Sequence, residues 1–271
     1  MEKIIEAVRN YWNVRPCNIR HSVRPVATKE YFDEVEKRKY FVEPHIPAFV
    51  QFEKWKGKKV LEIGCGIGTD SINFARAGAD LTVVDISDKS LEITKKRFEV
   101  YSLKAKFYCG NVEDLSSFLP IERYDLIYSF GVIHHTPSPK KAISEIKRFM
   151  NKETILKLMV YNRISWKAGW IVLKYGKGAF WRLDELVCHY SEAQIKCPVT
   201  YTYTINSVKK LFKEFEIEEL YIRHIFPYKI SDYVNYSYKK RWYFRAMPKR
   251  MFELLERRVG WHLCITAKLK E

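Results

Sequence analysis

The sequence predicts an α/β fold in which a seven-stranded, mostly parallel sheet carries helices on both faces and the last strand runs antiparallel. From about residue 57 onward, short β-branched runs alternate with helical patterns, which is typical of a parallel sheet covered on both sides. Near the end of the chain, two segments alternate polar and apolar residues with period two, which predicts a closing pair of strands joined as a hairpin.

The length and composition favour a folded protein of the cytoplasm. Of the 271 residues, 47% are hydrophobic, which is enough to bury a large core. There is no apolar run of about 18 residues, and the N-terminus lacks the basic-then-apolar order of a signal peptide. The six cysteines are scattered without a Cys-x-x-Cys pair, so we expect reduced thiols and no metal site.

The net charge of +16 is the unusual feature of the composition. It would attract phosphate-bearing molecules, other anionic partners and anionic membrane surfaces, without choosing among them. A solvated basic surface explains it equally well.

The individual elements follow from local patterns. We expect strands at 59–63, 81–85, 106–109, 124–129, 154–160, 216–222 and 261–268. Helices are expected at 70–77, 88–100, 139–150 and 207–215. Ser87 or Asp88 would cap the second helix, Ser207 would cap the fourth, and Pro139 suits a first helical position because its missing N–H needs no partner there.

Three segments fall outside this scheme and are rich in Tyr, Trp, Arg and Lys. We predict an N-terminal cap segment at 1–52 and a core at 53–271, with substrate-side insertions at about 163–206 and 224–258. Their mixture of aromatic and basic residues is suited to covering a cleft.

A glycine-rich loop follows the first predicted strand, with the sequence Gly64-Cys65-Gly66-Ile67-Gly68. Glycines there permit a tight turn and a close approach of ligand to backbone. In dinucleotide-binding loops two residues separate the second glycine from the third, so the third would fall at position 69 here. That position is Thr, which disfavours NAD. Asp85 ends the next strand, where its carboxylate could bind an adenosine ribose or cap the following helix.

Four runs follow one another along the chain: VLEIGCGIGTD (60–70), VDIS (84–87), GNVEDL (110–115) and DLIYSFGVIHH (125–135). In order and spacing they resemble the core of class I S-adenosylmethionine-dependent methyltransferases, in the branch of quinone-biosynthesis and other small-molecule enzymes. The resemblance covers about residues 57–162 and implies a Rossmann-like sheet. It also implies S-adenosyl-L-methionine as cofactor.

The resemblance implies roles for particular residues. Cofactor contacts fall to Glu62, Gly64, Cys65, Gly66, Gly68, Asp85, Ile86, Asn111, Val112 and Phe130. Glu62 would lie beside the cofactor's ammonium group and Asp85 would bind the ribose diol. The family commonly has Asp where this chain has Asn111, whose carbonyl can still accept from the adenine amino group. Phe130 would lie beneath the cofactor, or simply pack.

Methyl transfer from a sulfonium needs alignment more than acid–base chemistry, so a catalytic base is optional. His134 and His135 follow the fourth strand, at the sheet edge where ligands of such folds bind, and either could act as a base. A structural role near the cofactor explains them equally well, because family members with different substrates share histidines here.

Candidate substrate-binding residues lie at the fifth strand's end and in the N-terminal segment. They are Tyr161, Arg163, Tyr11, Trp12, Arg20 and His21. In related enzymes an N-terminal helical segment closes over the site; the alternatives are ordinary loop residues and a helix docked on the core.

We therefore predict methyl transfer to a small molecule that is aromatic or anionic. The aromatic and basic insertion at 228–258 could hold such an acceptor or touch a membrane surface as a peripheral contact. An RNA or protein methyltransferase, or a non-enzymatic S-adenosylmethionine-binding protein, is the alternative. Nucleic acid is left open but not favoured as a partner, because no RNA-binding module is visible.

Overall fold

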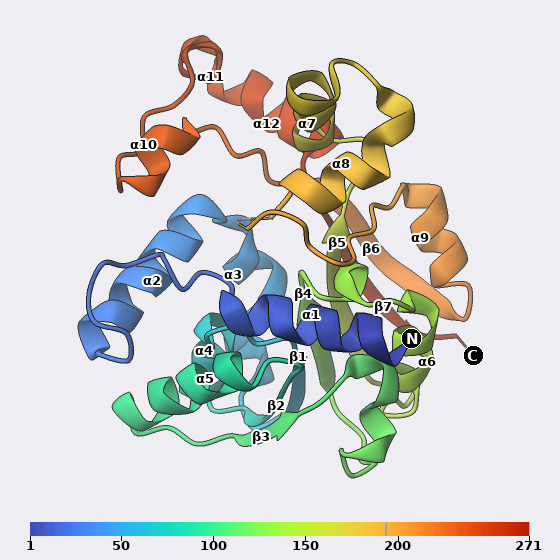
Figure 1. Ribbon diagram of the computed structural model, residues 1–271. Helices are drawn as coiled ribbons and strands as arrows, with labels where there is room; N and C mark the ends of the chain where they lie inside the picture. Colours follow the sequence, from blue (N-terminus) through green and yellow to red (C-terminus); the bar gives the residue numbers. More distant parts are fainter. Residues whose placement is uncertain (193, 271) are drawn as a thin grey trace.

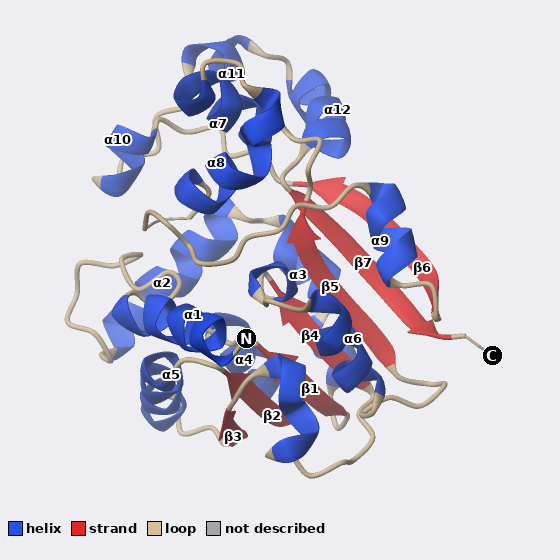
Figure 2. Cartoon of the chain, turned by 45° about the vertical axis from the view of Figure 1, so that its right-hand side comes forward, coloured by secondary structure: helices blue, strands red, loops and turns tan. Residues whose placement is uncertain are grey.

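The computed structural model describes residues 1–192 and 194–270 and contains one seven-stranded sheet (Figures 1 and 2). Its order is β3-β2-β1-β4-β5-β7-β6. The strands are β1 (Lys59–Ile63), β2 (Asp80–Asp85), β3 (Lys106–Cys109), β4 (Leu126–Phe130), β5 (Ile155–Tyr161), β6 (Phe215–Arg223) and β7 (His262–Leu269). The first five strands pair in parallel, whereas β7 runs antiparallel to both β5 and β6. The predicted fold class is confirmed.

Successive residues of the central strands face opposite sides of the sheet, and both sides are buried. In β4, Leu126 and Tyr128 pack in one hydrophobic cluster and Ile127 in the other. The first cluster includes side chains of α3 (His45–Val50), α4 (Thr69–Arg76) and α5 (Asp88–Val100), and the second those of α6 (Pro139–Lys147) and α9 (Ile205–Leu211). Figure 2 shows α6 and α9 in front of the strands and α3 behind them. The apolar runs therefore form central strands covered on both faces.

Short 3-10 turns connect several elements. They are η1 (Phe52–Trp55), η2 (Val112–Ser117), η3 (Ile133–His135) and η4 (Phe180–Arg182). The turns η2 and η3 follow β3 and β4, so they lie at the carboxyl edge of the parallel strands. This edge is where open α/β sheets bind ligands.

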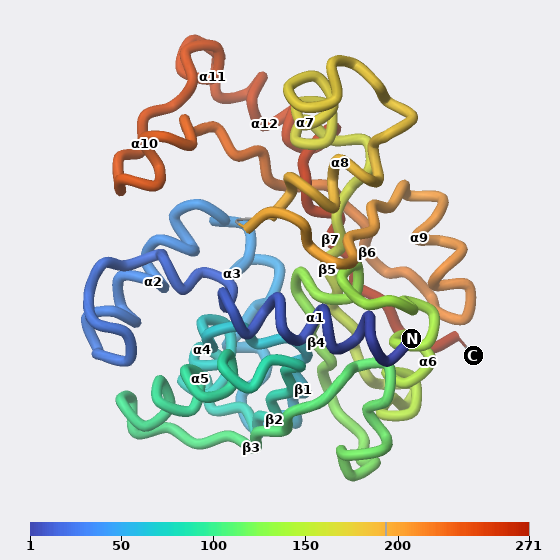
Figure 3. The backbone as a smooth tube through the Cα atoms, viewed as in Figure 1, coloured from blue at the N-terminus to red at the C-terminus, as the bar shows by residue number. Residues whose placement is uncertain are grey.

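The flanking segments contribute the other helices. They are α1 (Glu2–Val14), α2 (Lys29–Val42), α7 (Trp166–Gly176), α8 (Leu183–Tyr190), α10 (Ile230–Val234), α11 (Trp242–Ala246) and α12 (Lys249–Val259). In the tube view, α1 crosses in front of the sheet, while α7, α8 and α10–α12 lie together above it (Figure 3). Within the described ranges, no helix combines the length and apolarity needed to cross a membrane.

Local details differ from the sequence-based expectations at a few positions. The helix expected from Ser207 is capped by Thr204, whose hydroxyl oxygen accepts from the N–H of Ser207. The hydroxyl oxygen of Ser207 in turn accepts from the N–H of Thr204. The prediction of Ser207 as cap was wrong because a reciprocal capping box begins the helix three residues earlier. Ser87 does cap α5, accepting from the Ser90 N–H.

Candidate functional site

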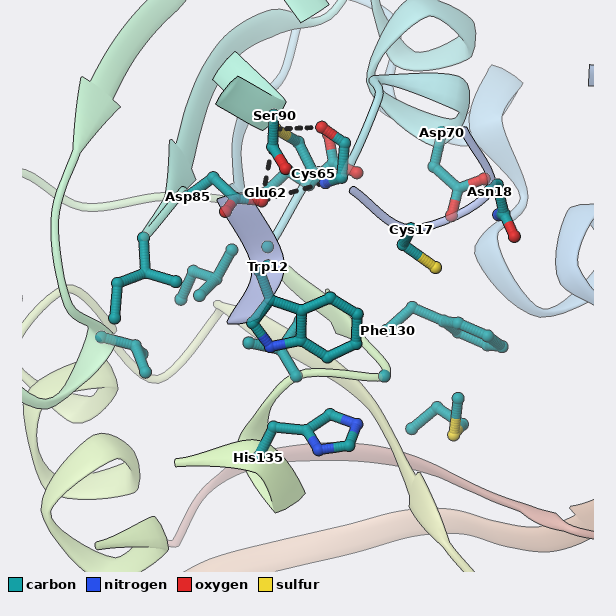
Figure 4. Close-up of a pocket in the computed structure, with 18 of the residues that line it drawn as sticks. Trp12, Cys17, Asn18, Glu62, Cys65, Asp70, Asp85, Ser90, Phe130 and His135 are labelled. Atoms are coloured by element: carbon teal, nitrogen blue, oxygen red, sulfur yellow. Dashed lines mark hydrogen bonds between the residues drawn. The ribbon is translucent and has the colours of Figure 1, made fainter. Parts of the chain in front are cut away.

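A cavity of about 290 Å³ lies at the carboxyl ends of β1, β2 and β4. Its walls come from the glycine loop, the ends of β2 and β4, the segment after β3, the N-terminal segment and residues of both insertions. Figure 4 shows Asp85 and Cys65 on one side of the indole of Trp12, with Phe130 and His135 on the other. Segments far apart in sequence therefore meet around one space.

The glycine loop has a backbone that other residues would not tolerate. Gly64 has φ +82°, and a Cβ there would lie 2.1 Å from Cγ2 of Val132. Gly68 has φ +73° and begins α4, where a Cβ would lie 2.7 Å from Cγ2 of Thr94. Gly64 lines the cavity, but Gly68 does not. Gly68 lies instead at the start of α4, against α5.

Asp85 lies at the end of β2 with its carboxylate held by backbone groups. Its Oδ2 accepts from the N–H of Gly66 at 2.9 Å, and its Oδ1 accepts from the N–H of Ser87 at 2.8 Å. Burial raises the pKa of Asp85 to about 6. The second lone pair of Oδ1 remains for a ligand, and that of Oδ2 accepts only from the Cys65 thiol at 3.7 Å, a weak donor that a ligand hydroxyl can displace.

Glu62 is a buried acid of β1 that faces the same cavity. Its side chain is almost inaccessible to solvent, and its Oε2 has no hydrogen-bond partner among the described residues. Burial, together with the smaller effect of the nearby Asp70, raises the pKa of Glu62 to about 8. An unpartnered buried carboxyl oxygen is costly, and a cationic ligand group would satisfy it.

The remaining predicted cofactor residues also line the cavity. They are Cys65, Gly66, Ile86, Asn111, Val112 and Phe130. The side-chain oxygen of Asn111 accepts from the N–H of Glu113 and so caps η2. One lone pair of that oxygen is left for a ligand, as an uncharged acceptor.

The N-terminal segment closes the cavity from above. Trp12 and Cys17 both line it, and a Cβ on Gly66 would lie 3.5 Å from the Cβ of Cys17. Lys39 of α2 pairs with Asp70 of α4 at 2.8 Å, and both side chains are largely buried. The N-terminal segment is therefore joined to the glycine-loop helix by a buried ion pair at the cavity wall.

The two adjacent histidines differ in their surroundings. His135 lines the cavity, with its Nδ1 lying 2.9 Å from the carbonyl of Val199 and its Nε2 buried without a hydrogen-bond partner. Because a carbonyl only accepts, Nδ1 carries the proton and the lone pair of Nε2 is free. His134 is buried outside the cavity lining, with its ring centroid 3.7 Å from that of Tyr161. Burial lowers the pKa of both imidazoles, and hence both are neutral at pH 7.

Several predicted substrate residues do not reach the cavity. The hydroxyl of Tyr11 donates to the carbonyl of Gln194, and His21 lies 3.1 Å from the hydroxyl of Tyr233. Arg20 and Arg163 are likewise absent from the lining.

The reason is that these residues join other segments of the chain to one another. The backbone carbonyl of Arg20 accepts from the hydroxyl of Tyr236, and the side chain of Arg163 forms an ion pair with Asp184. Trp12 and Tyr161 do line the cavity, and the hydroxyl of Tyr161 donates to Glu192 at 2.9 Å.

Sequence reasoning missed several ionisable residues of the lining. They are Lys39, Glu43, Asp70, Lys167, Glu192, His224 and His262. Lys39 in the last turn of α2 and Glu43 at its C-cap are four residues apart, and this spacing of opposite charges was a signal that could have drawn attention to the pair. No local pattern marks the others, because they come from segments that meet only in the folded chain.

Comparisons with known proteins agree with the fold and the core motifs. Residues 60–153 match the family model described as a methyltransferase domain. Among curated proteins, a ubiquinone biosynthesis O-methyltransferase of Actinobacillus pleuropneumoniae serotype 5b is 32% identical over 110 residues, which cover 40% of this chain and 47% of that protein. One of Haemophilus ducreyi is 28% identical over 171 residues, which cover 58% of this chain and 72% of that protein. The chain thus spans about half the length of the first of these relatives.

Solved structures share the fold over nearly the whole chain. The magnesium protoporphyrin IX methyltransferase of Synechocystis PCC 6803 with bound SAH has a TM-score of 0.60 at 17% identity, covering 98% of this chain and 99% of that one. TehB of Haemophilus influenzae has a TM-score of 0.54 at 16% identity, covering 88% of this chain and 66% of that one. Residues 60–153 therefore match a methyltransferase domain, and the chain shares the fold of class I S-adenosylmethionine-dependent methyltransferases, with a core similar in sequence to that of quinone-biosynthesis enzymes.

Proposed function

We propose that this protein transfers a methyl group from S-adenosyl-L-methionine to a small molecule that is aromatic or anionic. The observation that carries the proposal is the convergence of Asp85, Glu62 and the glycine loop on one cavity, which continues to Tyr161 and His135. One end offers acceptors for a ribose and a cation. The other offers aromatic rings and a neutral imidazole.

The end of the cavity near Glu62 and Asp85, here called the donor end, matches the ammonium and ribose groups of the methyl donor. The free Oε2 of Glu62 would accept from the ammonium of the methionine part, and Asp85 would accept from the two ribose hydroxyls. The backbone of the glycine loop allows close approach, because a side chain at Gly64 would clash with Val132. When bound, the donor supplies a methyl group already activated on a sulfonium leaving group.

The protein's contribution would be alignment of the acceptor and exclusion of water. Trp12 and Cys17 cover the cavity from the N-terminal segment. His135 can hold a proton from the acceptor at its free Nε2, which lies 3.7 Å from Oε1 of Glu192. That carboxylate would stabilise the imidazolium so formed.

The acceptor end favours a flat or anionic molecule. Phe130, Tyr161 and Trp261 line it, and the ammonium of Lys167 lies 4.7 Å from the centroid of the Trp261 ring. Aromatic faces and one buried cation match an aromatic acid or a similar anion. The curated relatives named above are O-methyltransferases of ubiquinone biosynthesis, which supports an aromatic acceptor here.

We further propose a cytoplasmic location and a peripheral contact with anionic membrane surfaces. All six cysteines are free thiols in the described part of the chain, which suits a reducing compartment. Trp181 and Trp242 of the insertions are exposed at 86% and 73%, on a protein with a net charge of +16. Exposed indoles and cations together favour a membrane interface over a nucleic-acid partner.

Binding of S-adenosylhomocysteine, measured by isothermal titration calorimetry, tests the donor site. Asp85→Ala should weaken binding by about 1.5–3 kcal/mol, because it removes a charged hydrogen-bond acceptor. Asp80→Ala is the matched control, since Asp80 begins the same strand on the exposed side, away from the cavity. Equal affinity in the wild type and Asp85→Ala would refute the ribose assignment, and no binding by the wild type would refute the proposed function.

A further inference from the structure

Three histidines from distant parts of the chain meet beside the cavity. They are His45 at the start of α3, His224 after β6 and His262 at the start of β7. One ring nitrogen from each lies within 4.8 Å of the other two. His224 and His262 line the cavity, and the His45 and His262 rings lie 6.1 Å and 5.3 Å from the ring of Phe130.

A neutral imidazole offers one ring-nitrogen lone pair to a metal ion. Two of the three rings face each other through such nitrogens. The Nε2 of His45 lies 3.0 Å from the Nδ1 of His262, close to the separation of about 3.4 Å between two nitrogen ligands of a tetrahedral zinc ion.

Glu43 is placed to orient one of these rings. Its Oε1 lies 3.6 Å from the Nε2 of His262, on the opposite side of the ring from the Nδ1 that faces His45. A carboxylate that accepts from the outer N–H of a histidine fixes its tautomer and leaves the inner nitrogen free to bind a metal. At 3.6 Å the Glu43–His262 pair is just beyond hydrogen-bonding distance, and a small shift of the Glu43 side chain would complete this arrangement.

The backbone of His224 is an independent sign of a built site. This buried residue has φ +73°, a left-handed conformation that non-glycine residues seldom adopt. Its carbonyl accepts from the N–H of Trp261 at 2.7 Å, and its ring stacks on that of His262 with centroids 4.5 Å apart. The strained turn brings the His224 ring against the other two histidines, and such strain clusters at functional sites.

We propose that His45, His224 and His262 bind one divalent transition-metal ion of the zinc class, with a coordination position open to the cavity. The inference departs from the sequence-based expectation of no metal site, which rested on the cysteine pattern. Three protein ligands and an open position are the arrangement of catalytic zinc sites. The role we give the ion, which is to hold an oxygen of the acceptor, rests on the proposed function; metal binding itself does not.

Charges around the cluster bear on this proposal. The positive charges of Lys167, Lys39 and Arg223 lie close enough to the histidines to oppose a cation there. The carboxyl groups of Glu43 and Glu192 lie near Lys167 and favour a cation, and Oε1 of Glu43 is 3.6 Å from the Nε2 of His262.

Titration of the metal-free protein with Co²⁺, followed by visible absorption, tests the site directly. The wild type should bind one ion and show the intense d–d bands of a four-coordinate site. His224→Ala and His262→Ala should lose this spectrum, and Glu43→Gln should weaken binding roughly 10- to 100-fold. His189→Ala is the matched control, because His189 belongs to α8 and lies outside the cavity lining.

Binding of S-adenosylhomocysteine by each variant reports that the fold and donor site are intact. A wild type that takes up no Co²⁺ would overturn the proposal. So would an unchanged spectrum in both histidine variants, or a thiolate-to-metal band that disappears in Cys17→Ser. A wild type that binds S-adenosylhomocysteine but no Co²⁺ would sink only the metal site, whereas a wild type that does not bind S-adenosylhomocysteine would sink the proposed function.

Discussion

Lys39 and Asp70 form a buried ion pair with a distance of 2.8 Å, between a helix of the N-terminal segment and the helix that follows the glycine loop. The same carboxylate accepts from the hydroxyls of Tyr40 and Tyr128. Asp70 is thus surrounded by donors from α2 of the N-terminal segment and from β4 of the sheet. The pair fixes the N-terminal segment over the cavity.

Removing the cation should destabilise the protein. Lys39→Ala leaves the Asp70 carboxylate buried without its counter-ion, at a cost of about 3–5 kcal/mol in the free energy of unfolding. Urea denaturation followed by circular dichroism measures the loss. Lys37→Ala, on the exposed side of the same helix, should stay within about 0.5 kcal/mol of the wild type. A Lys39→Ala protein as stable as that control would show that packing of the N-terminal segment on α4 does not depend on the Lys39–Asp70 ion pair.

Donor binding should weaken in acid. With its pKa raised to about 6 by burial, Asp85 is a carboxylate above that pH and a neutral acid below it. Protonation removes lone pairs that the ribose hydroxyls need, and therefore the affinity for S-adenosylhomocysteine should fall as pH drops through 6. Calorimetry at pH values from about 5 to about 8 follows the change. An Asp85→Asn variant should show a flatter profile; an equally steep one would point to another group.

Donor binding at pH 7 should release a proton. Glu62 is mostly protonated at that pH, because its pKa is about 8, and a neighbouring ammonium group would lower this pKa. Calorimetric titrations in two buffers of different ionisation enthalpy measure the proton released per site. Glu62→Gln should abolish the release and weaken binding by about 1.5–3 kcal/mol. Unchanged proton release in this variant would contradict the assignment.

The two adjacent histidines should differ in function. His135→Ala should leave donor affinity unchanged but lower kcat about 10²- to 10⁴-fold, because it removes the one imidazole of the pair that faces the cavity. His134→Ala should instead lower the free energy of unfolding by about 1–3 kcal/mol, since its ring packs on Tyr161. Turnover of an aromatic acid found by screening, together with thermal unfolding, separates the two effects. Equal kcat losses with unchanged stability would contradict the distinction.

Local patterns were sufficient to predict the seven strands, the helices α4, α5, α6 and α9, and the position of the glycine loop and Asp85 at one edge of the sheet. Gly64 and Asp85 end neighbouring strands, and the carboxyl ends of parallel strands meet at one edge, so their proximity follows from the sequence. Single side chains were less predictable. His134 and His135 are adjacent and chemically equal in sequence, yet only His135 faces the cavity.

The sequence by itself determined the alternation of strands and helices, because hydrophobic period, glycines and capping residues act over a few neighbouring positions. Only the tertiary structure decided which distant side chains meet: Lys39 with Asp70, Glu43 with His262, and His45 with His224. These contacts join segments separated by long stretches of chain. Packing of the whole molecule sets their distances, and no local pattern encodes them.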